Sequence, residues 1–530
     1  MTKAASFLAL SLLLVSMAAA QETPAPATQP AANADTSKTG EHKDTDKDTA
    51  PIPPEKSSVT HHELAIGGKS LKYTATAGTL LIRDADEKPY GSLFYVAYTV
   101  DGAEPGTRPV SFLYNGGPGS ATIWLHMGSF SPVRVSTDSP NPTAGPPFKL
   151  IPNQYSLLDK TDLVFVDAPL TGLSRAVGKG QPKDLIGTDP DLRAFDRFIQ
   201  RYLTVNQRWN SPKFLIGESY GTTRSAALAD MLGNDGVQLN GVVLISSILN
   251  FSIRAPGYDF IYIANLPSYA AAAWYFDKVP NKPASLADWV EQARQFAAGP
   301  YAQALFAGDT LPAAQLDDIA KQVSRFTGLS VDYVKETNLR ISPFRFRKEV
   351  LRADHKTLGR YDMRFEGEDV DAAGETPGYD ASDTAISGAF VGAFHNYLEG
   401  ELKYQTSDTY RPTAYDLTRD WDLKHIPTSP TPGGGSGPGS AQPQPYVAAD
   451  LASAIRKNPH LHVFSANGYF DLATPFFATE YDISHMYLEP ELRGNIQFGY
   501  YPSGHMIYLN VDALHQLKDD LAAFIDKAEK

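Results

Sequence analysis

Short apolar runs alternate with helical patterns along most of the chain, and this alternation constrains the fold more than any other feature. Strands buried on both faces of a parallel sheet are almost continuously apolar, and parallel neighbours need a crossover that is usually a helix. The sequence therefore predicts an α/β fold with a mostly parallel central sheet flanked by helices. The expected strands are 92–100, 110–114, 163–167, 213–216, 242–245, 461–465 and 495–498, and the expected helices are 192–203, 222–232 and 512–528.

One expected strand leads into a G-x-S-x-G pentapeptide with Ser219 at its centre. The strand KFLI precedes the pentapeptide, and the helical pattern TTRSAALADML follows it. This strand–turn–helix setting is typical of a nucleophile elbow, whose glycines permit the sharp turn that presents the serine hydroxyl. The helix N-terminus adds donors and a dipole that favour developing negative charge. An ordinary turn with an N-cap serine could have the same sequence, but the strand before it and the helix after it favour a catalytic Ser219.

A catalytic serine needs a general base, and the base needs an orienting carboxylate. In folds that carry this elbow, the chain order is serine, acid, histidine. His505 follows the last expected strand, and Asp471 follows the strand before it, 34 residues earlier. Catalytic groups gather at such strand ends in open α/β sheets. The sequence therefore predicts a triad of Ser219, Asp471 and His505. The alternatives Asp482, His485 and His515 lack this strand-end position.

Several blocks, in order along the chain, resemble the serine carboxypeptidase family of α/β-hydrolases. The blocks are Tyr114–Gly119 (YNGGPG), Asn153–Ser156 followed by VFVDAPLTGLS, Gly217–Tyr220, Asn467–Pro475 and Gly504–Met506. The resemblance covers roughly 71–250 and 461–509. It implies an α/β-hydrolase fold with a large helical insertion. It also implies removal of C-terminal amino acids from peptides through an acyl-enzyme, with no cofactor and no metal.

The resemblance implies further site residues around the triad. The backbone N–H groups of Gly117 and Tyr220 match the family's oxyanion hole. Asn115, Gly116 and Glu218 match the positions that grip the substrate's terminal carboxylate. A glutamate that faces a carboxylate must keep a shared proton, since two like charges in contact cannot both ionise. We therefore expect a raised pKa for the glutamate and activity that favours mildly acidic pH.

The chain also departs from the family pattern. Tyr114 stands where the family usually has tryptophan, and cysteine is absent throughout. The acidic residue that often follows the glycine loop is missing, and His126 stands in that stretch. Tyr114 and His126 are therefore candidates for the substrate pocket, with a core role for His126 kept open. After Gly504–Met506, the usual proline is replaced by Ile507–Tyr508.

Composition divides the chain into segments. Residues 1–20 are predicted to be a signal peptide, with Lys3, an apolar run and small residues before the cleavage site. A Pro/Ala/Thr-rich spacer at 21–56 has almost nothing to bury and is expected to be disordered. The hydrolase core comprises 57–250 and 446–530. Residues 251–445 are predicted to form a helical cap insertion that includes a Pro/Gly/Ser-rich loop at 427–445.

Charge and residue usage narrow the classes of function. The chain has 47 Lys and Arg against 60 Asp and Glu, a formal net charge of −13, which disfavours nucleic-acid binding. The absence of cysteine excludes disulfides, thiolate metal sites and a cysteine nucleophile. The signal peptide predicts export to the periplasm or the extracellular medium without a stable membrane anchor. The expected partners are peptides with a free C-terminus, and the oligomeric state stays open.

Other functions remain as alternatives. The same triad could serve an esterase or acyltransferase, which would be favoured if Asn115 or Glu218 proved unnecessary. A hydrolase fold without catalysis could serve binding, but all three triad residues are in place. A metalloprotease is disfavoured because His61-His62-Glu63 lacks a second ligand at helical spacing.

Overall fold

The computed structural model describes residues 50–416, 419–430 and 440–530, which lie in one compact unit. The predicted signal peptide, most of the predicted spacer and the centre of the 427–445 loop lie outside the described residues. Within the described ranges, every helix is too short or too polar to cross a membrane.

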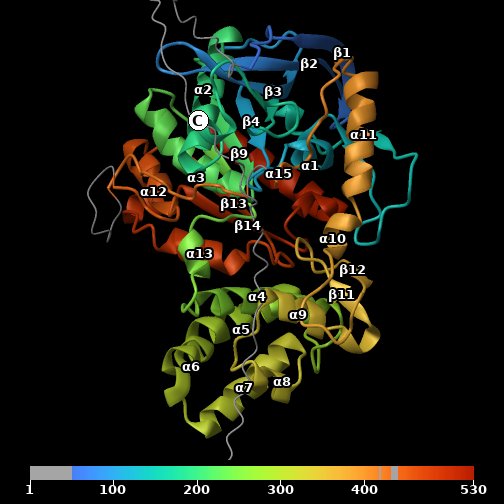
Figure 1. The fold of residues 1–530 in the computed structure, drawn as a ribbon, viewed down its shortest axis with the longest axis vertical. Helices are drawn as coiled ribbons and strands as arrows, with labels where there is room; N and C mark the ends of the chain where they lie inside the picture. The colour runs from blue at the N-terminus through green and yellow to red at the C-terminus, as the bar shows by residue number, and fades with distance from the viewer. Residues whose placement is uncertain (1–49, 417–418, 431–439) are drawn as a thin grey trace, which may run out of the picture. The chain divides into compact units, whose positions relative to one another are not determined.

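A ten-stranded mixed sheet runs through the centre of the unit (Figure 1). The strand order is β1-β2-β3-β7-β4-β9-β10-β13-β14, with β8 beside β3. The pairs from β1 to β7 are antiparallel, and those from β7 to β14 are parallel. The bounds are β1 Ser57–Ile66, β2 Lys69–Arg83, β3 Pro89–Val100, β4 Val110–Tyr114, β7 Asp162–Val166, β8 Arg175–Ala176, β9 Lys213–Glu218, β10 Gly241–Ile245, β13 His462–Gly468 and β14 Ile496–Tyr501.

Alternate residues of the central strands feed two apolar cores, one on each face of the sheet. In β9, Phe214 and Ile216 face the core that contains α15, whereas Leu215 faces the core that contains α2, α3 and α12. Strands β4, β7, β9 and β10 are buried at every residue, as expected for a sheet covered on both sides. The covering helices are α2 Thr188–Val205, α3 Tyr220–Asn234, α12 Ala448–Lys457 and α15 Val511–Ala528.

The predicted α/β fold is confirmed, and all seven predicted strands and three predicted helices are present within a few residues of their expected ends. Strands β1 and β2 were not predicted. They lie at the antiparallel end of the sheet, and β1 alternates exposed with part-buried residues. A strand with one face in solvent lacks the continuous apolar run by which the buried strands were recognised.

A helical layer with its own apolar core follows β10. Figure 1 shows α4 to α9 together below the sheet in this view. Their apolar cluster includes Trp289 and Phe326, and it also takes in Phe470 and Phe476 from the segment after β13. The bounds are α4 Phe260–Tyr275, α5 Leu286–Phe296, α6 Ala302–Ala307, α7 Ala313–Thr327, α8 Val331–Glu336 and α9 Pro343–Glu349.

The stretch predicted as one cap, 251–445, divides between two cores. Helix α11 (Ser387–Gly400) carries Phe390, Phe394 and Tyr397 into the core of the sheet, not into the helical layer. A Phe- and Ala-rich helical pattern predicts a helix, but it does not specify which apolar surface the helix covers. The smaller elements are α1 Ile123–Leu125, α10 Ala381–Thr384, α13 Phe476–Ser484, α14 Pro490–Arg493 and the two-stranded pairs β5–β6 (Val133–Val135, Leu150–Pro152) and β11–β12 (Lys356–Leu358, Glu366–Glu368).

A buried histidine ties the segment before α12 to the core. His425 is 2% exposed, and its ring nitrogens lie 2.7 Å from Asp189 Oδ1 and 3.1 Å from Asp450 Oδ2. Burial disfavours the charged ring, but the two carboxylates outweigh burial and raise the pKa of His425 to about 9. The imidazolium is therefore the form that the fold stabilises.

Replacing His425→Gln is expected to lower the free energy of unfolding by about 3 kcal/mol at pH 6, because buried Asp450 loses its counter-charge. Since the folded-state pKa is raised, this stabilisation is complete below the ordinary pKa of 6.5 and is lost as pH rises through about 9. Urea unfolding of both proteins at pH 6 and pH 10 measures the difference, which should shrink at pH 10. Equal stabilities at pH 6 would contradict this role.

Candidate active site

Ser219 occupies the turn between β9 and α3. Its backbone has φ 60° and ψ −128°, a conformation that side-chain-bearing residues rarely adopt. The Ser219 amide donates to the Ile245 carbonyl at 3.0 Å, which holds the turn against β10. A Cβ at Gly217 would collide with the Gly221 carbonyl, so the pentapeptide requires its first glycine. Strain of this kind is typical of a site that presents a reactive side chain.

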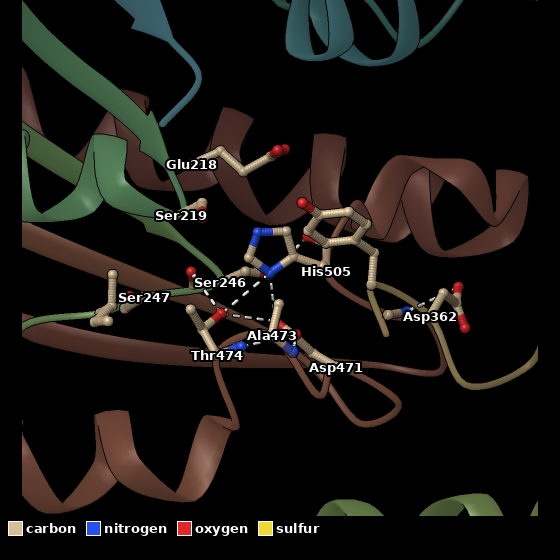
Figure 2. Close-up of polar contacts among 12 residues, drawn as sticks. Glu218, Ser219, Ser246, Ser247, Asp362, Asp471, Ala473, Thr474 and His505 are labelled. Carbon is tan, nitrogen blue, oxygen red and sulfur yellow. Dashed lines mark hydrogen bonds and ion pairs between the residues drawn. The ribbon is translucent and has the colours of Figure 1, made fainter. Parts of the chain in front are cut away.

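His505 and Asp471 follow the ends of β14 and β13 and are in contact. His505 Nδ1 lies 2.8 Å from Asp471 Oδ2, and the side chains are 3% and 1% exposed. Because a carboxylate only accepts, Nδ1 carries the hydrogen and Nε2 keeps a lone pair. Figure 2 shows this second nitrogen on the side of Ser219. Burial disfavours the imidazolium, but Asp471 and then Glu218 outweigh burial, and the pKa of His505 is raised.

The structure brings the three predicted triad residues together. Ser219 and His505 both line one cleft, and Asp471 lies behind the imidazole (Figure 2). The described contacts include no hydrogen bond between the Ser219 hydroxyl and His505. Such bonds are often long without substrate and tighten when it binds. The arrangement can therefore support a serine nucleophile with a histidine base.

Thr474 fixes the orientation of the Asp471 carboxylate, and this contact was not predicted from the sequence. Its hydroxyl oxygen lies 2.8 Å from Asp471 Oδ2 and 3.1 Å from His505 Nδ1. The amides of Ala473 and Thr474 donate to Asp471 Oδ1 at 2.8 and 3.0 Å. Both oxygens of the carboxylate are therefore fixed. An aspartate that accepts from amides two and three residues later forms an Asx turn, and D-L-A-T is a sequence compatible with one.

The 359–365 segment, which follows the helical layer, is hydrogen-bonded to both loops that carry the acid and the base. Its carbonyls accept from the amides of Leu472 and His505, the latter at 2.6 Å. The Asp362 carboxylate accepts from the Gly504 amide at 3.1 Å. Figure 2 shows Asp362 beside the His505 loop. The positions of Asp471 and His505 thus depend on a segment of the insertion.

The glycine loop after β4 lies directly against the start of α3. A Cβ at Gly116 would collide with the Tyr220 backbone nitrogen, and Gly117 has φ +107°, which favours glycine. Within the described residues, the N–H groups of Gly117 and Tyr220 have no protein acceptor. Two free backbone donors beside a serine can stabilise an oxyanion.

Glu218 lines the cleft, and its carboxyl group is buried. Asn115 Nδ2 donates to Glu218 Oε1 at 2.7 Å, and Asn115 Oδ1 accepts from the Leu125 amide at 2.8 Å, which fixes the amide orientation. Glu218 Oε2 and the Tyr508 hydroxyl are buried without a partner in hydrogen-bond geometry among the described residues, although Tyr508 is a close neighbour of Glu218. Burial raises the pKa of Glu218 to about 7, although His505, Tyr508 and Asn115 each oppose the rise.

The side chains of Tyr114 and His126, predicted as pocket candidates, do not line the cleft. The Tyr114 hydroxyl is bonded to Ser225 Oγ at 2.8 Å, beneath the serine turn. His126 Nε2 lies 2.7 Å from the Tyr98 hydroxyl, and burial lowers the pKa of His126 to about 3, so the ring is neutral. The core role left open for His126 is the one that its surroundings fit. Trp124 of the same stretch reaches the cleft instead.

The cleft has a volume of about 740 Å³ and lies between the sheet loops, α11 and the helical layer. Its aromatic and charged lining residues are Trp124, Phe251, Phe344, Tyr361, Tyr379, Tyr415, Arg254, Arg347, Arg360, Asp380 and Asp383. Asp482, His485 and His515 do not line it. Asp482, which lies in α13, contacts Asn250, and His485 and His515 pack against tyrosines elsewhere.

Residues 69–265 match the family model described as serine carboxypeptidase, a stretch that includes the glycine loop and Ser219. Over this stretch the chain resembles the serine carboxypeptidase family. Serine carboxypeptidase-like 36 of Arabidopsis thaliana is 25% identical over 193 residues, 35% of this chain and 38% of the relative. The pheromone-processing carboxypeptidase KEX1 of Saccharomyces cerevisiae is 31% identical over 156 residues, 27% of this chain and 20% of the relative. The matched stretches thus span well under half of either curated relative.

A solved structure supports the family's fold over most of the chain. The crystal structure of KEX1(delta)P, a prohormone-processing carboxypeptidase from Saccharomyces cerevisiae, superimposes with a TM-score of 0.52 at 15% identity. The superposition covers 86% of this chain and 91% of that one. At this identity, the likeness is one of fold. The fold of this chain is therefore the α/β-hydrolase fold that the motifs implied.

Proposed function

We propose that this protein is a serine-type carboxypeptidase that removes C-terminal amino acids from peptides through an acyl-enzyme on Ser219. The observation that carries the proposal is the carboxyl group of Glu218, which is buried, has one unpaired oxygen and lies next to the nucleophile. A carboxyl group with a pKa of about 7 is neutral at acidic pH, and it can then donate a hydrogen bond to a carboxylate. The relatives named as carboxypeptidases support the same conclusion.

In the proposed reaction, the Ser219 oxygen attacks the carbonyl carbon of the last peptide bond while His505 Nε2 takes the serine proton. Asp471 stabilises the imidazolium, and the N–H groups of Gly117 and Tyr220 stabilise the oxyanion. The carbon–nitrogen bond then breaks, and His505 gives its proton to the departing amino group. Water repeats the sequence on the acyl-enzyme and releases the shortened peptide.

The proposed binding site for the substrate's terminal carboxylate consists of the Glu218 carboxyl group, the Asn115 amide and the backbone of Gly116. Asn115 is held by β4 and α1, and it in turn holds Glu218, so the group is preorganised. Preorganised donors lose little freedom on binding, which favours affinity for the carboxylate. An endopeptidase or a simple esterase would not need such a site.

The proposal is tested with a blocked dipeptide that has a free C-terminal carboxylate and with its C-terminal amide, each at pH 5 and pH 8. Release of the terminal amino acid from the free acid, with little or no turnover of the amide, is the expected result. The Ser219→Ala variant is the control for contaminating peptidases. Cleavage of neither peptide, alongside serine-dependent turnover of a simple ester, would indicate an esterase or acyltransferase instead.

The kcat/KM for the free-acid peptide is expected to fall as pH rises through about 7, because ionised Glu218 repels the terminal carboxylate. Replacing Glu218→Gln leaves a neutral donor of the same shape, so the alkaline fall should disappear. A pH–rate profile of both proteins measures this effect. An ester substrate without a carboxylate is the control, since its profile should not report Glu218. A fall that persists unchanged in the glutamine variant would exclude Glu218 as its source.

We also propose export of the chain through the predicted signal peptide at 1–20. Cleavage after Ala20 would leave a mature protein that begins at Gln21. Intact-mass analysis of the protein recovered from its native host is expected to show this N-terminus. A mass that retains Met1 or Thr2 in the mature protein would contradict export by this route.

A further inference from the structure

We propose that Arg254 and Arg360 form an anion-binding subsite for the side chain of the penultimate peptide residue, the residue whose carbonyl group Ser219 attacks. The subsite would favour aspartate or glutamate at that position. This inference rests on the proposed carboxypeptidase function and adds the substrate class that the cleft selects.

Both arginines line the cleft without a carboxylate partner. Arg254 donates from one guanidinium nitrogen to the Ala473 carbonyl at 2.5 Å. The Arg360 guanidinium lies 5.4 Å from the centre of the Tyr361 ring. Neither forms an ion pair with any described Asp or Glu, although most arginines in this part of the chain do. Their remaining donors are available to a ligand in the cleft.

The two guanidinium groups line the same cleft, and the charge of one acts on the other. Burial, and next the charge of Arg360, lower the pKa of Arg254 to about 10. Arg254 nevertheless stays charged at neutral pH. Asp471 offsets part of this repulsion without forming an ion pair with Arg254, and an anion between the two arginines would relieve the rest. A carboxylate suits this position because guanidinium groups bind carboxylates through paired N–H donors.

The acidic side chains of the cleft do not neutralise the pair. Asp380 accepts from the Arg360 backbone amide and from Ser382, and it lies 3.9 Å from Arg347. Asp383 accepts from the Ser387 hydroxyl at 3.0 Å, at the start of α11. Arg347 itself is bonded to backbone carbonyls of Leu358 and Tyr379, a structural role.

The position of Ala473 indicates which end of the substrate meets the arginines. The Ala473 amide donates to Asp471 behind the imidazole, on the Nδ1 side of His505. Figure 2 shows Glu218 and Ala473 on opposite sides of the His505 ring. If Glu218 holds the terminal carboxylate, Arg254 faces the acyl portion of the peptide. The nearest side chain of that portion belongs to the penultimate residue.

The test compares blocked dipeptides that share a neutral terminal residue and carry Glu, Gln or Lys at the penultimate position. The wild-type kcat/KM is expected to be about tenfold higher for Glu than for Gln, the effect of one charge-assisted hydrogen bond. Arg254→Gln and Arg360→Gln should each bring this ratio of Glu to Gln rates close to one. Arg345→Gln is the matched control, because Arg345 pairs with Glu375 outside the cleft lining.

Four results would overturn the inference. Equal wild-type rates for Glu and Gln peptides would do so while leaving the carboxypeptidase function intact. A loss shared equally by all three peptides in Arg254→Gln would assign a structural role through the Ala473 carbonyl. The third is a preference that Arg360→Glu does not shift towards the Lys peptide. If no peptide is cleaved, the proposed function fails. Calorimetry of the Glu and Gln peptides with the Ser219→Ala variant still measures binding at the arginine subsite. Equal affinities for the two peptides would overturn the inference.

Discussion

Replacing Ser219 by alanine is expected to lower kcat for peptide hydrolysis about a million-fold, to the level that binding and the oxyanion donors alone provide. The hydroxyl is the only group at the elbow that can form the acyl-enzyme. Its removal leaves the turn itself in place, because the turn is held by the Ser219 amide and the flanking glycines. Thermal unfolding of the variant should therefore match the wild type.

The measurement combines single-turnover kinetics with labelling by a fluorophosphonate, which reacts with activated serines. Peptide mapping should locate the label on Ser219 in the wild type and find no label in the variant. Ser252→Ala is a suitable control, because Ser252 is exposed and does not line the cleft. Retention of peptidase activity in the Ser219 variant would exclude the proposed nucleophile.

Replacing Asp471 by asparagine is expected to lower kcat about ten-thousand-fold with little loss of stability. The amides of Ala473 and Thr474 both donate to Asp471 Oδ1, so the asparagine must keep its oxygen at that position. Its NH2 group then points to His505 Nδ1 and forces the ring hydrogen onto Nε2. In that tautomer the ring cannot accept the serine proton, and the imidazolium also loses its counter-charge.

A matched control for this variant is Asp482→Asn, which changes another buried aspartate that was the alternative acid. Asp482 lies in α13, contacts Asn250 and is not part of the cleft lining. Because its replacement removes no group in contact with the substrate, kcat should stay within about twofold of the wild type. Activity assays of the two variants under identical conditions decide between the candidate acids. A large loss in the Asp482 variant together with normal activity in the Asp471 variant would reverse the assignment.

Much of the architecture was predictable because buried parallel strands appear in the sequence as short, almost continuously apolar runs. The run KFLIGESYG predicted the strand, the turn and the nucleophile together, since few residue types can occupy that turn without a steric clash. The order of Ser219, Asp471 and His505 followed from the ends of the strands. The catalytic roles of these residues, and those of Gly117, Tyr220, Asn115, Gly116 and Glu218, remain predictions.

Features that depend on contacts between distant segments were not predictable. Nothing in the sequence near His126 indicates that its ring packs against Phe165 and not in the cleft. The replacement of proline by Ile507–Tyr508 was visible, but its consequence, a hydroxyl beside Glu218, needed the fold. The same holds for α11, whose apolar face could equally have covered the helical layer.

The hydrogen bonds from the 359–365 segment to the loops of Asp471 and His505 have a consequence for how this protein could evolve or be redesigned. A lid that only covers a cleft can be exchanged between relatives as a module, and specificity then changes without cost to turnover. Here the backbone that holds the loops of Asp471 and His505 belongs partly to the insertion. Grafting a foreign insertion onto this core would therefore change specificity without lowering turnover only if Tyr361, Asp362 and their neighbours were kept.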